Sequence, residues 1–334
     1  MTIRKDDGLP TISDVALRAR VARSTVSRAF SRPEMISAST VERVKKAATA
    51  LGYVPNYAAR ALSTGLHGNI AIIVPDIANP FFPPLIRAVQ AGADAEGYSV
   101  FLGDSDEDAG RELKLADRFA NQVEGFILAS PRSAQQNIMD LNKRRPVVVI
   151  NRDIADLPRV LIDPALGVKD AVAHLVDLGH RKMVYVSGPA VSWSDQQRRL
   201  ALRHAAASHD IRIDTISAER PTFNAGLKVV SAVLHSGATA AITFDDFVAH
   251  GLLSGLAEHH IPVPKKFSVI GMDDVLGAST FPALTSVSGR CDEAGRIAIQ
   301  LLIGAMQGKS SDICTVLRTH LAIRATTGQA FRRQ

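Results

Sequence analysis

Cationic and hydroxyl side chains crowd one short stretch near the start of the chain, and their chemistry suits nucleic acid. The polar members of this stretch are Arg23, Ser24, Thr25, Ser27 and Arg28. An arginine can donate two parallel hydrogen bonds to a guanine, and serine or threonine hydroxyls can donate to phosphate oxygens. On one face of a helix, these residue types predict a surface that enters the major groove of DNA.

Two short helices joined by a tight turn are expected to position that face. Apolar residues at helical spacing give each helix an inner stripe. The stripes are Ile12, Val15, Ala16 and Ala19 in the first helix, and Val26, Ala29 and Phe30 in the second. Thr11 or Ser13 can cap the first helix, and Val21 lies in the turn. The alternative interpretation is an ordinary helical hairpin whose basic face is only solvated.

Positive charge is concentrated in the same region. Residues 1–65 contain eleven Lys and Arg residues against five Asp and Glu residues, an excess that equals the net charge of +6 for the whole chain of 334 residues. The remaining residues therefore sum to zero. Phosphate binding explains such an asymmetry and solubility does not, so the charge favours the DNA-binding interpretation.

A third amphipathic helix is predicted over residues 38–51, capped by Ser37 or Ser39 and ended by Gly52. An extended break follows. Residues 56–65 can form one more short helix, but a helix of this length is not stable alone in water. It would need a partner in order to fold.

Beyond residue 68 the chain alternates short apolar runs with amphipathic segments. This alternation predicts an α/β fold with parallel sheets covered by helices on both faces. The expected strands are 70–74, 98–102, 124–129, 147–150, 159–162, 183–186, 240–244 and 268–271. The expected helices are 80–96, 109–122, 134–144, 165–178, 195–208, 224–235, 247–260 and 292–307. Such sheets bind ligands at the carboxyl ends of their strands.

Other classes of protein lack their sequence signals in this chain. No run approaches a membrane span and the first residues are polar and charged, so neither a membrane segment nor a signal peptide is expected. With only Cys291 and Cys314 no disulfide is expected, which favours the cytoplasm. The glycine motifs for phosphates and dinucleotides are missing, as are His-Glu-x-x-His and Cys-x-x-Cys. We therefore expect no enzyme activity, no cofactor and no metal.

Several segments together resemble the LacI family of bacterial transcription regulators. They are TISDVALRARVARSTVSRAF, LGYVPN and AARALSTG, followed by IAIIVPDIANPFF, GHRKMVYVSGP, IPVPKKFSVIGMDD and FPALTSV. The resemblance implies a small all-α helix-turn-helix headpiece at 1–55, a hinge helix and linker at 56–67, and a periplasmic-binding-protein-like core at 68–334.

The resemblance further divides the core into two Rossmann-like lobes. The lobes would comprise about 68–163 with 291–320, and about 164–290 with 321–334, joined by crossovers near 162–164, 288–292 and 319–322. In the family, the core also makes a homodimer through its N-terminal lobe and holds a small ligand between the lobes.

DNA-binding roles follow from the resemblance by position. Arg23, Ser24 and Arg28 match base-reading positions. Leu62 matches a leucine that wedges into the minor groove, and an apolar wedge of this kind can kink DNA. The other expected DNA-binding residues are Thr11, Thr25, Ser27, Tyr53 and Asn56. The alternative for Leu62 is packing on the next domain.

Two headpiece positions depart from the family pattern. Arg20 stands where the family usually has glycine in the turn, and it would have to accept a left-handed conformation. Ala22 stands where the family has a serine cap, and loss of a cap costs about 1 kcal/mol.

Effector-binding residues are expected in the cleft between the lobes. They are Phe81, Phe82, Asn151, Arg152, Trp193, Ser194, Arg198, Asp245 and Asp273. Arginine and aspartate pairs suit hydroxyl-rich ligands, so a sugar or a nucleoside is expected. Asp245 stands where the family commonly has asparagine, and a carboxylate cannot donate a hydrogen bond. As alternatives, Phe81 and Phe82 are plain core, and Asp246 and Asp274 are helix caps.

The resulting prediction is a cytoplasmic, homodimeric transcription regulator, a repressor, that binds double-stranded operator DNA under the control of a small ligand. Two other classes stand beside it: a solute-binding protein for uptake, and a dinucleotide-dependent enzyme on a Rossmann-like sheet. The basic N-terminal region and the lack of a signal peptide weigh against the first. The missing glycine motif weighs against the second.

Overall fold

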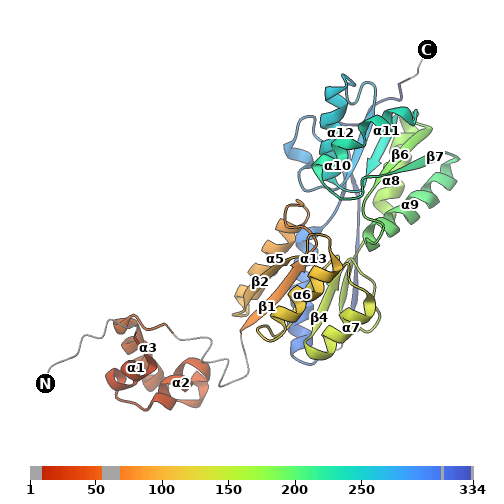
Figure 1. The fold of residues 1–334 in the computed structure, drawn as a ribbon. Coiled ribbons are helices and arrows are strands. Elements are labelled where there is room, and N and C mark those ends of the chain that lie inside the picture. Colours follow the sequence, from red (N-terminus) through yellow and green to blue (C-terminus); the bar gives the residue numbers. More distant parts are fainter. Residues whose placement is uncertain (1–9, 55–67, 310–311, 332–334) are drawn as a thin grey trace. The chain divides into compact units, whose positions relative to one another are not determined.

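The computed structural model describes residues 10–54, 68–309 and 312–331, and it separates into two compact units, residues 1–68 and 69–334 (Figure 1). The expected hinge helix and linker at 56–67 lie outside the described residues. The smaller unit is helical and the larger one is α/β, which confirms the fold class expected from the sequence.

In its described part, the smaller unit contains three α-helices and one 3-10 turn around a single core. The elements are α1 (Ile12–Ala19), α2 (Arg23–Ser31), the turn Pro33–Met35, and α3 (Ala38–Leu51). The core consists of Val15, Ala16, Ala19, Val26, Ala29, Val44, Ala47 and Ala48. Two left-handed residues, Arg20 and Gly52, end α1 and α3 with φ of 53° and 66°. The predicted helix-turn-helix and third helix are confirmed.

The larger unit is built on two six-stranded sheets. The first sheet contains β1 (Asn69–Val74), β2 (Ser99–Asp104), β3 (Phe126–Ala129), β4 (Val147–Ile150), β5 (Arg159–Asp163) and β11 (Cys314–Arg318). Its order is β11-β5-β4-β3-β1-β2, with all strands parallel. We call the lobe formed on this sheet the first lobe.

The second lobe is formed on the other sheet, whose order is β12-β10-β9-β8-β6-β7. Its strands are β6 (Lys182–Ser187), β7 (Arg212–Ser217), β8 (Ala240–Thr243), β9 (Ser268–Asp273), β10 (Thr285–Ser288) and β12 (Leu321–Ala322). All are parallel except β12, which pairs antiparallel with β10. The expected parallel sheets are confirmed, and the two-residue strand β12 is an antiparallel addition at one edge.

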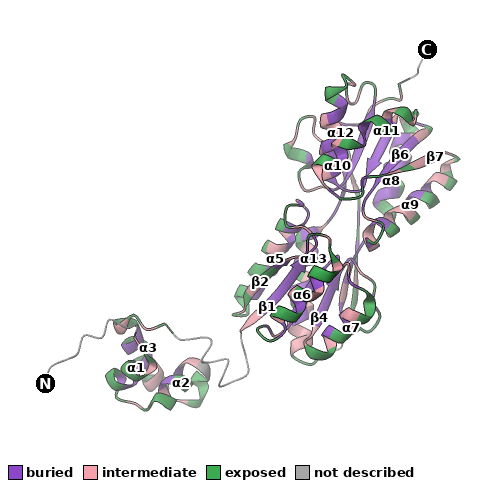
Figure 2. Cartoon of the chain, in the orientation of Figure 1, coloured by how far each residue is buried: buried purple, intermediate pink, exposed green. Residues whose placement is uncertain are grey.

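Helices cover both faces of each sheet, and the central strands between them are buried (Figure 2). In the first lobe, α5 (Phe82–Ala95) and α13 (Cys291–Met306) pack on one face, and α6 (Ala109–Phe119) and α7 (Gln135–Arg144) on the other. In the second lobe, α8 (Ala165–Asp177) and α9 (Trp193–His209) pack on one face, and α10 (Phe223–Lys228), α11 (Val230–His235) and α12 (Asp246–Glu258) on the other. A short 3-10 turn lies at Gly277–Ser279.

The chain passes between the two lobes three times. It leaves β5 for α8, returns from β10 to α13, and leaves β11 for β12. The helix expected over 224–235 is two helices that meet at Val229. Among the described residues, no helix is long and apolar enough to cross a membrane.

Candidate DNA-binding face and inter-lobe cleft

The outer face of α2 carries the polar residues that the sequence singled out. Arg23, Ser24, Ser27 and Arg28 are exposed and Thr25 is half-buried. Val26 and Ala29, on the inner face of the helix, are buried in the headpiece core. Within the described residues, neither Arg23 nor Arg28 forms an ion pair, so both guanidinium groups stay available to phosphate or base edges.

Arg20 and Ala22, the two residues that depart from the family pattern, have the expected geometry in the turn before α2. Arg20 adopts the left-handed conformation and donates its backbone N–H to the end of α1. Ala22 occupies the N-cap position of α2 and supplies no side-chain hydrogen bond there. The turn is secured from elsewhere, since Arg43 of α3 donates from Nε to the carbonyl oxygen of Ala19 over 3.1 Å. Arg43 is one of the eleven basic residues within 1–65, and in the structure it links α3 to the end of α1.

The other expected DNA-binding residues lie around this turn or outside the described part. Thr11 is exposed and caps α1, with its backbone N–H and hydroxyl both donating to Asp14. Tyr53 packs against Phe30 with the ring centroids 6.1 Å apart. Asn56 and Leu62 lie outside the described residues.

In the larger unit, a cavity between the lobes collects residues from the carboxyl ends of strands. It is lined by Asn79, Phe81, Phe82, Glu107, Ser130, Arg132, Asn151, Ser192, Ser194, Arg198, Pro221, Phe244, Asp245 and Asp273. Ser130, Asn151 and Asp273 end β3, β4 and β9 with φ of 50°, 53° and 101°. Non-glycine residues with positive φ are uncommon and gather at binding sites, where the surrounding structure holds the strained turn in place.

Arg198 and Asp273 form the central ion pair of the cavity. Arg198 of α9 donates from Nη2 to Oδ1 of Asp273 over 2.8 Å and from Nη1 to the carbonyl oxygen of Phe244. Its guanidinium group also lies 4.6 Å from the centroid of the Phe244 ring. Burial raises the pKa of Asp273, and the charge of Arg198 opposes that shift.

Asp245 links the two lobes. It is the N-cap of α12, where Oδ1 accepts from the backbone N–H of Val248 over 2.8 Å. Its Oδ2 accepts from the side-chain amide of Asn79, which belongs to the first lobe, also over 2.8 Å. Burial, together with the nearby charge of Asp273, raises the pKa of Asp245 to about 7.

A second ion pair lines the first-lobe side of the cavity. Arg132 donates to Glu107 through Nε and Nη2, over 2.5 and 3.0 Å. A third ion pair, between Arg220 of the second lobe and Asp106 of the first, lies next to it at the surface. These residues and Asn79 escaped the sequence reasoning because they occupy loops after strands.

The aromatic pair fulfils both interpretations that the sequence left open. Phe81 and Phe82 pack edge to face with centroids 5.1 Å apart, and both belong to the apolar core beneath β1. Both also line the cavity. The cavity itself has a volume of about 30 Å³, which holds one or two water molecules. A ligand of sugar size therefore enters only when the lobes separate.

Two expected effector-binding residues do not line this cavity. Arg152 and Trp193 are adjacent in sequence to Asn151 and Ser194, which do line it, but their side chains do not reach it. The alternation of neighbouring side chains at a strand end and at a helix start accounts for the miss.

Two further aspartates prove to be structural. Asp246 is not a cap: it accepts from the hydroxyl of Ser286 over 2.6 Å and from the backbone N–H of Val275 over 3.0 Å. Asp274 forms an ion pair with Arg324 over 2.7 Å, away from the cavity. Among the described residues, no cluster of three or more His, Cys, Asp or Glu side chains is placed to hold a metal ion.

A polar helix-turn-helix face and a two-lobed core with a polar cleft together define the class of ligand-controlled DNA-binding regulators. Comparison with known proteins places the chain within that class. The family model for bacterial regulatory proteins of the lacI family matches residues 11–56 of the sequence. The family model for the periplasmic binding protein-like domain matches residues 172–327. The HTH-type transcriptional repressor CytR of Escherichia coli K12 is 32% identical over 92% of this chain and 93% of its own length. The chain therefore belongs to the LacI family of transcription regulators.

Solved structures agree on the fold. A lac repressor dimer bound to operator and the anti-inducer ONPF aligns with a TM-score of 0.83 at 24% identity, over 96% of this chain and all of the other. A LacI family regulator from Enterococcus faecalis V583 with bound ribose aligns with a TM-score of 0.71 at 27% identity, over 78% of this chain and 98% of the other. These relatives are regulators of transcription and not enzymes.

Proposed function

We propose that this regulator is a cytoplasmic repressor that reads a palindromic operator through α2 and releases or retains it according to the ligand in the cleft. The observation that carries the proposal is the exposed cationic face of α2 on a fully apolar inner core. In this proposal Arg23, Ser24 and Arg28 read bases, while Thr11, Thr25, Ser27 and Tyr53 position the headpiece on phosphates. Asn56 and Leu62 act in the hinge.

Binding of genomic fragments tests this function. The purified chain is mixed with sheared genomic DNA, and the bound fragments are sequenced. A repressor of this kind enriches a short palindrome, because a homodimer presents two identical headpieces to two half-sites. Binding that is sensitive to salt but enriches no sequence contradicts the proposal.

The effector is proposed to be a small hydroxyl-bearing molecule of the sugar or nucleoside class, bound by Arg198, Asp273 and Asn151 against Phe81 and Phe82. Charge-assisted hydrogen bonds from arginine and aspartate discriminate strongly against ligands that lack the hydroxyl. The ribose-bound relative from Enterococcus faecalis supports this class. Exchange of inter-lobe contacts for ligand contacts would change the separation of the lobes and hence the DNA affinity.

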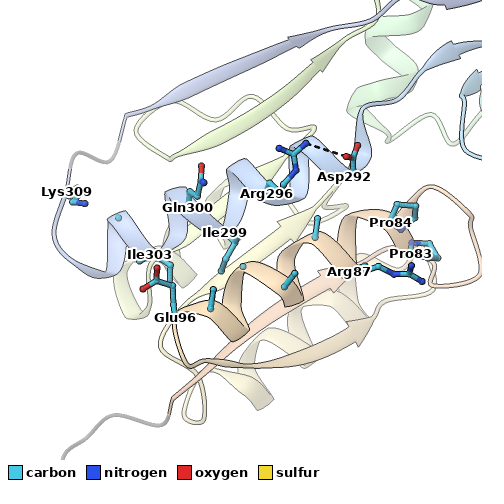
Figure 3. Close-up of a pocket in the computed structure, with 15 residues that line it drawn as sticks. Pro83, Pro84, Arg87, Glu96, Asp292, Arg296, Ile299, Gln300, Ile303 and Lys309 are labelled. Atoms are coloured by element: carbon cyan, nitrogen blue, oxygen red, sulfur yellow. Dashed lines mark hydrogen bonds and ion pairs between the residues drawn. The ribbon is translucent and has the colours of Figure 1, made fainter. Parts of the chain in front are cut away.

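The homodimer is proposed to form through the first lobe, where a groove runs between α5 and α13 (Figure 3). The groove has a volume of about 830 Å³. Its floor is apolar, with Ala88, Ala91, Ile299 and Ile303. Arginine, lysine and acidic side chains rise along its edges, and the Arg296–Asp292 pair is visible in Figure 3. It lies on the helical face of the sheet and offers no convergent polar groups to a small ligand.

Substitution of Ala91 by Glu tests the dimer. Ala91 is exposed in the single chain, so a glutamate is solvated there and the fold persists. Buried in a dimer interface, the same charge loses its hydration and disfavours association. We expect a monomer by light scattering for Ala91→Glu and a dimer for the control Asp94→Ala, which changes an exposed position on the same helix. A dimeric Ala91→Glu protein would place the interface elsewhere.

A further inference from the structure

The side chains that line the cleft include more acidic groups than basic ones. Three carboxylates line the cavity, together with two guanidinium groups. Arg132 pairs with Glu107 through two hydrogen bonds, and Arg198 pairs with Asp273 over 2.8 Å. Asp245 has no arginine or lysine of its own within the described residues. The cavity therefore carries one surplus carboxylate, and that carboxylate is Asp245.

The surroundings of Asp245 make a negative charge there costly. Its exposed fraction is 1%. Only neutral donors bind it, namely the amide of Asn79 and the backbone N–H of Val248. The charged groups that face it from the packed elements are Asp273 of β9 and Arg198 of α9, and Arg198 is already paired with Asp273. Asp246 directly follows it, as the first residue of α12, and is a further buried acid. A buried carboxylate in these surroundings is neutralised by a bound proton or compensated by a cation.

Helix capping does not by itself explain the residue. Asparagine, serine and threonine cap as well as aspartate does, and they bring no charge. Capping uses only Oδ1 of Asp245. The other oxygen, Oδ2, points to the opposite lobe, where it accepts from Asn79. When the lobes part, this inter-lobe hydrogen bond breaks and Oδ2 faces whatever enters the cleft.

The remaining polar groups define the rest of such a ligand. Arg198 can donate to hydroxyls, Asn151 can donate to them or accept from them, and Phe81 and Phe82 form an apolar wall beside these residues. A molecule that satisfies both parts of the cleft has hydroxyl groups at one end and a cationic nitrogen at the other. Amino sugars have that arrangement.

This inference rests on the proposed function and narrows it. We propose that the effector is an amino sugar, or a hydroxylated amine of similar size, whose protonated nitrogen binds Oδ2 of Asp245 in place of Asn79. The amine compensates the surplus carboxylate, and the loss of the Asn79 contact couples ligand entry to lobe separation. The hydroxyl groups bind Arg198 and Asp273.

Matched pairs of ligands test the proposal on the full chain. The probes are D-glucosamine against D-glucose, D-galactosamine against D-galactose, and D-mannosamine against D-mannose, with affinity measured by titration calorimetry. We expect at least one amine to bind about tenfold more tightly than its parent sugar, a difference of about 1.4 kcal/mol. Asp245→Asn should remove this preference, so that each amine and its parent sugar bind with similar affinity. Asp106→Asn is the control, because it removes the same charge from the surface pair beside the cavity, and it keeps the preference.

The pH dependence gives a second readout. The pKa of Asp245 is raised to about 7, so a cationic ligand displaces a proton from it. The affinity of the amines for the wild-type chain should therefore increase between about pH 5.5 and 7, where the amine stays protonated, and Asp245→Asn should abolish the increase. Each of three results would overturn the inference. They are parent sugars that bind as tightly as the amines, no binding by any amine, and a preference for the amine that persists in Asp245→Asn. The proposed function has its own test and fails if the chain selects no operator. If neutral sugars alter operator binding, the proposed function stands and only the inference of an amine effector is overturned.

Discussion

The polar groups of the headpiece face are mostly exposed, whereas the central polar groups of the cleft are buried and paired with each other. Arg23 and Arg28 of the headpiece are exposed, and water satisfies them until DNA arrives. Arg198 and Asp273 of the cleft are buried and satisfy each other. An exposed face needs no rearrangement to bind, so its affinity depends on charge and salt. A self-paired cleft must exchange internal bonds for ligand bonds, and that exchange is what allows a ligand to change the conformation.

The largest expected effect on operator affinity lies on the DNA side. Arg28→Ala removes a guanidinium group from the base-reading face without disturbing the core, because Arg28 is exposed and packs on nothing buried. Loss of one bidentate contact to a base costs about 1–3 kcal/mol, which is roughly 5- to 150-fold in operator affinity. Lys46→Ala is the matched control, since it removes the same charge from the exposed face of α3. Equal losses for both variants, measured by fluorescence anisotropy, would mean that α2 contributes charge alone.

The next effect breaks the self-paired cleft. Asp273→Asn keeps the shape of the side chain and removes the charge that Arg198 faces. Removing one partner of a buried pair costs about 3–5 kcal/mol, so the larger unit should unfold at lower denaturant and operator binding should no longer respond to ligand. Asp274→Asn changes the next carboxylate, which has its own arginine outside the cavity. An unaltered response in Asp273→Asn would exclude Asp273 from the effector site.

The sequence predicts the two regions unequally well. The headpiece is local: helical spacing, a left-handed turn and a glycine stop all fall within a few residues, and the third helix is found with its bounds at Ala38–Leu51. In the core, the eight apolar runs are strands, but four strands were missed. Of these, β7 is a half-exposed edge strand and β10 is rich in serine and threonine, so neither gives an apolar run.

The cleft shows the same limit at the level of single residues. Asp273, Arg198 and Asp245 follow apolar strands or begin helices, so their positions could be found from the pattern. Asn79 and Arg132 depend on how loops fold back across the lobes, which no local spacing encodes. Arg152 and Trp193 neighbour cavity residues in the sequence but do not line the cavity in this structure, and their part in effector binding stays a prediction.

A moderate effect separates buried from exposed carboxylates through pH. Because the pKa of Asp245 is raised from 3.8 to about 7, the folded chain binds more protons than the unfolded chain between those values. The stability contributed by this group is therefore lost as pH rises toward 7 and stays lost above it. Relative to wild type, Asp245→Asn should gain roughly 1–3 kcal/mol in unfolding free energy between pH 5 and pH 8. Asp140→Asn, at an exposed residue whose pKa is lowered by Lys143, should show no such gain in denaturant titrations at both pH values.

The smallest effect concerns the turn of the headpiece, where the sequence departs from glycine. Arg20 adopts φ of 53° and ψ of 50°, which costs an ordinary residue about 1 kcal/mol and costs glycine nothing. Its side chain is exposed, so Arg20→Gly loses no buried contact. We expect the headpiece to melt a few degrees higher in thermal unfolding followed by circular dichroism. Arg18→Gly, two residues earlier within α1, should melt lower by a similar amount, because glycine inside a helix costs about 1 kcal/mol. Equal shifts of one sign in both variants would show that the loss of arginine charge, and not the left-handed backbone, governs the stability of the turn.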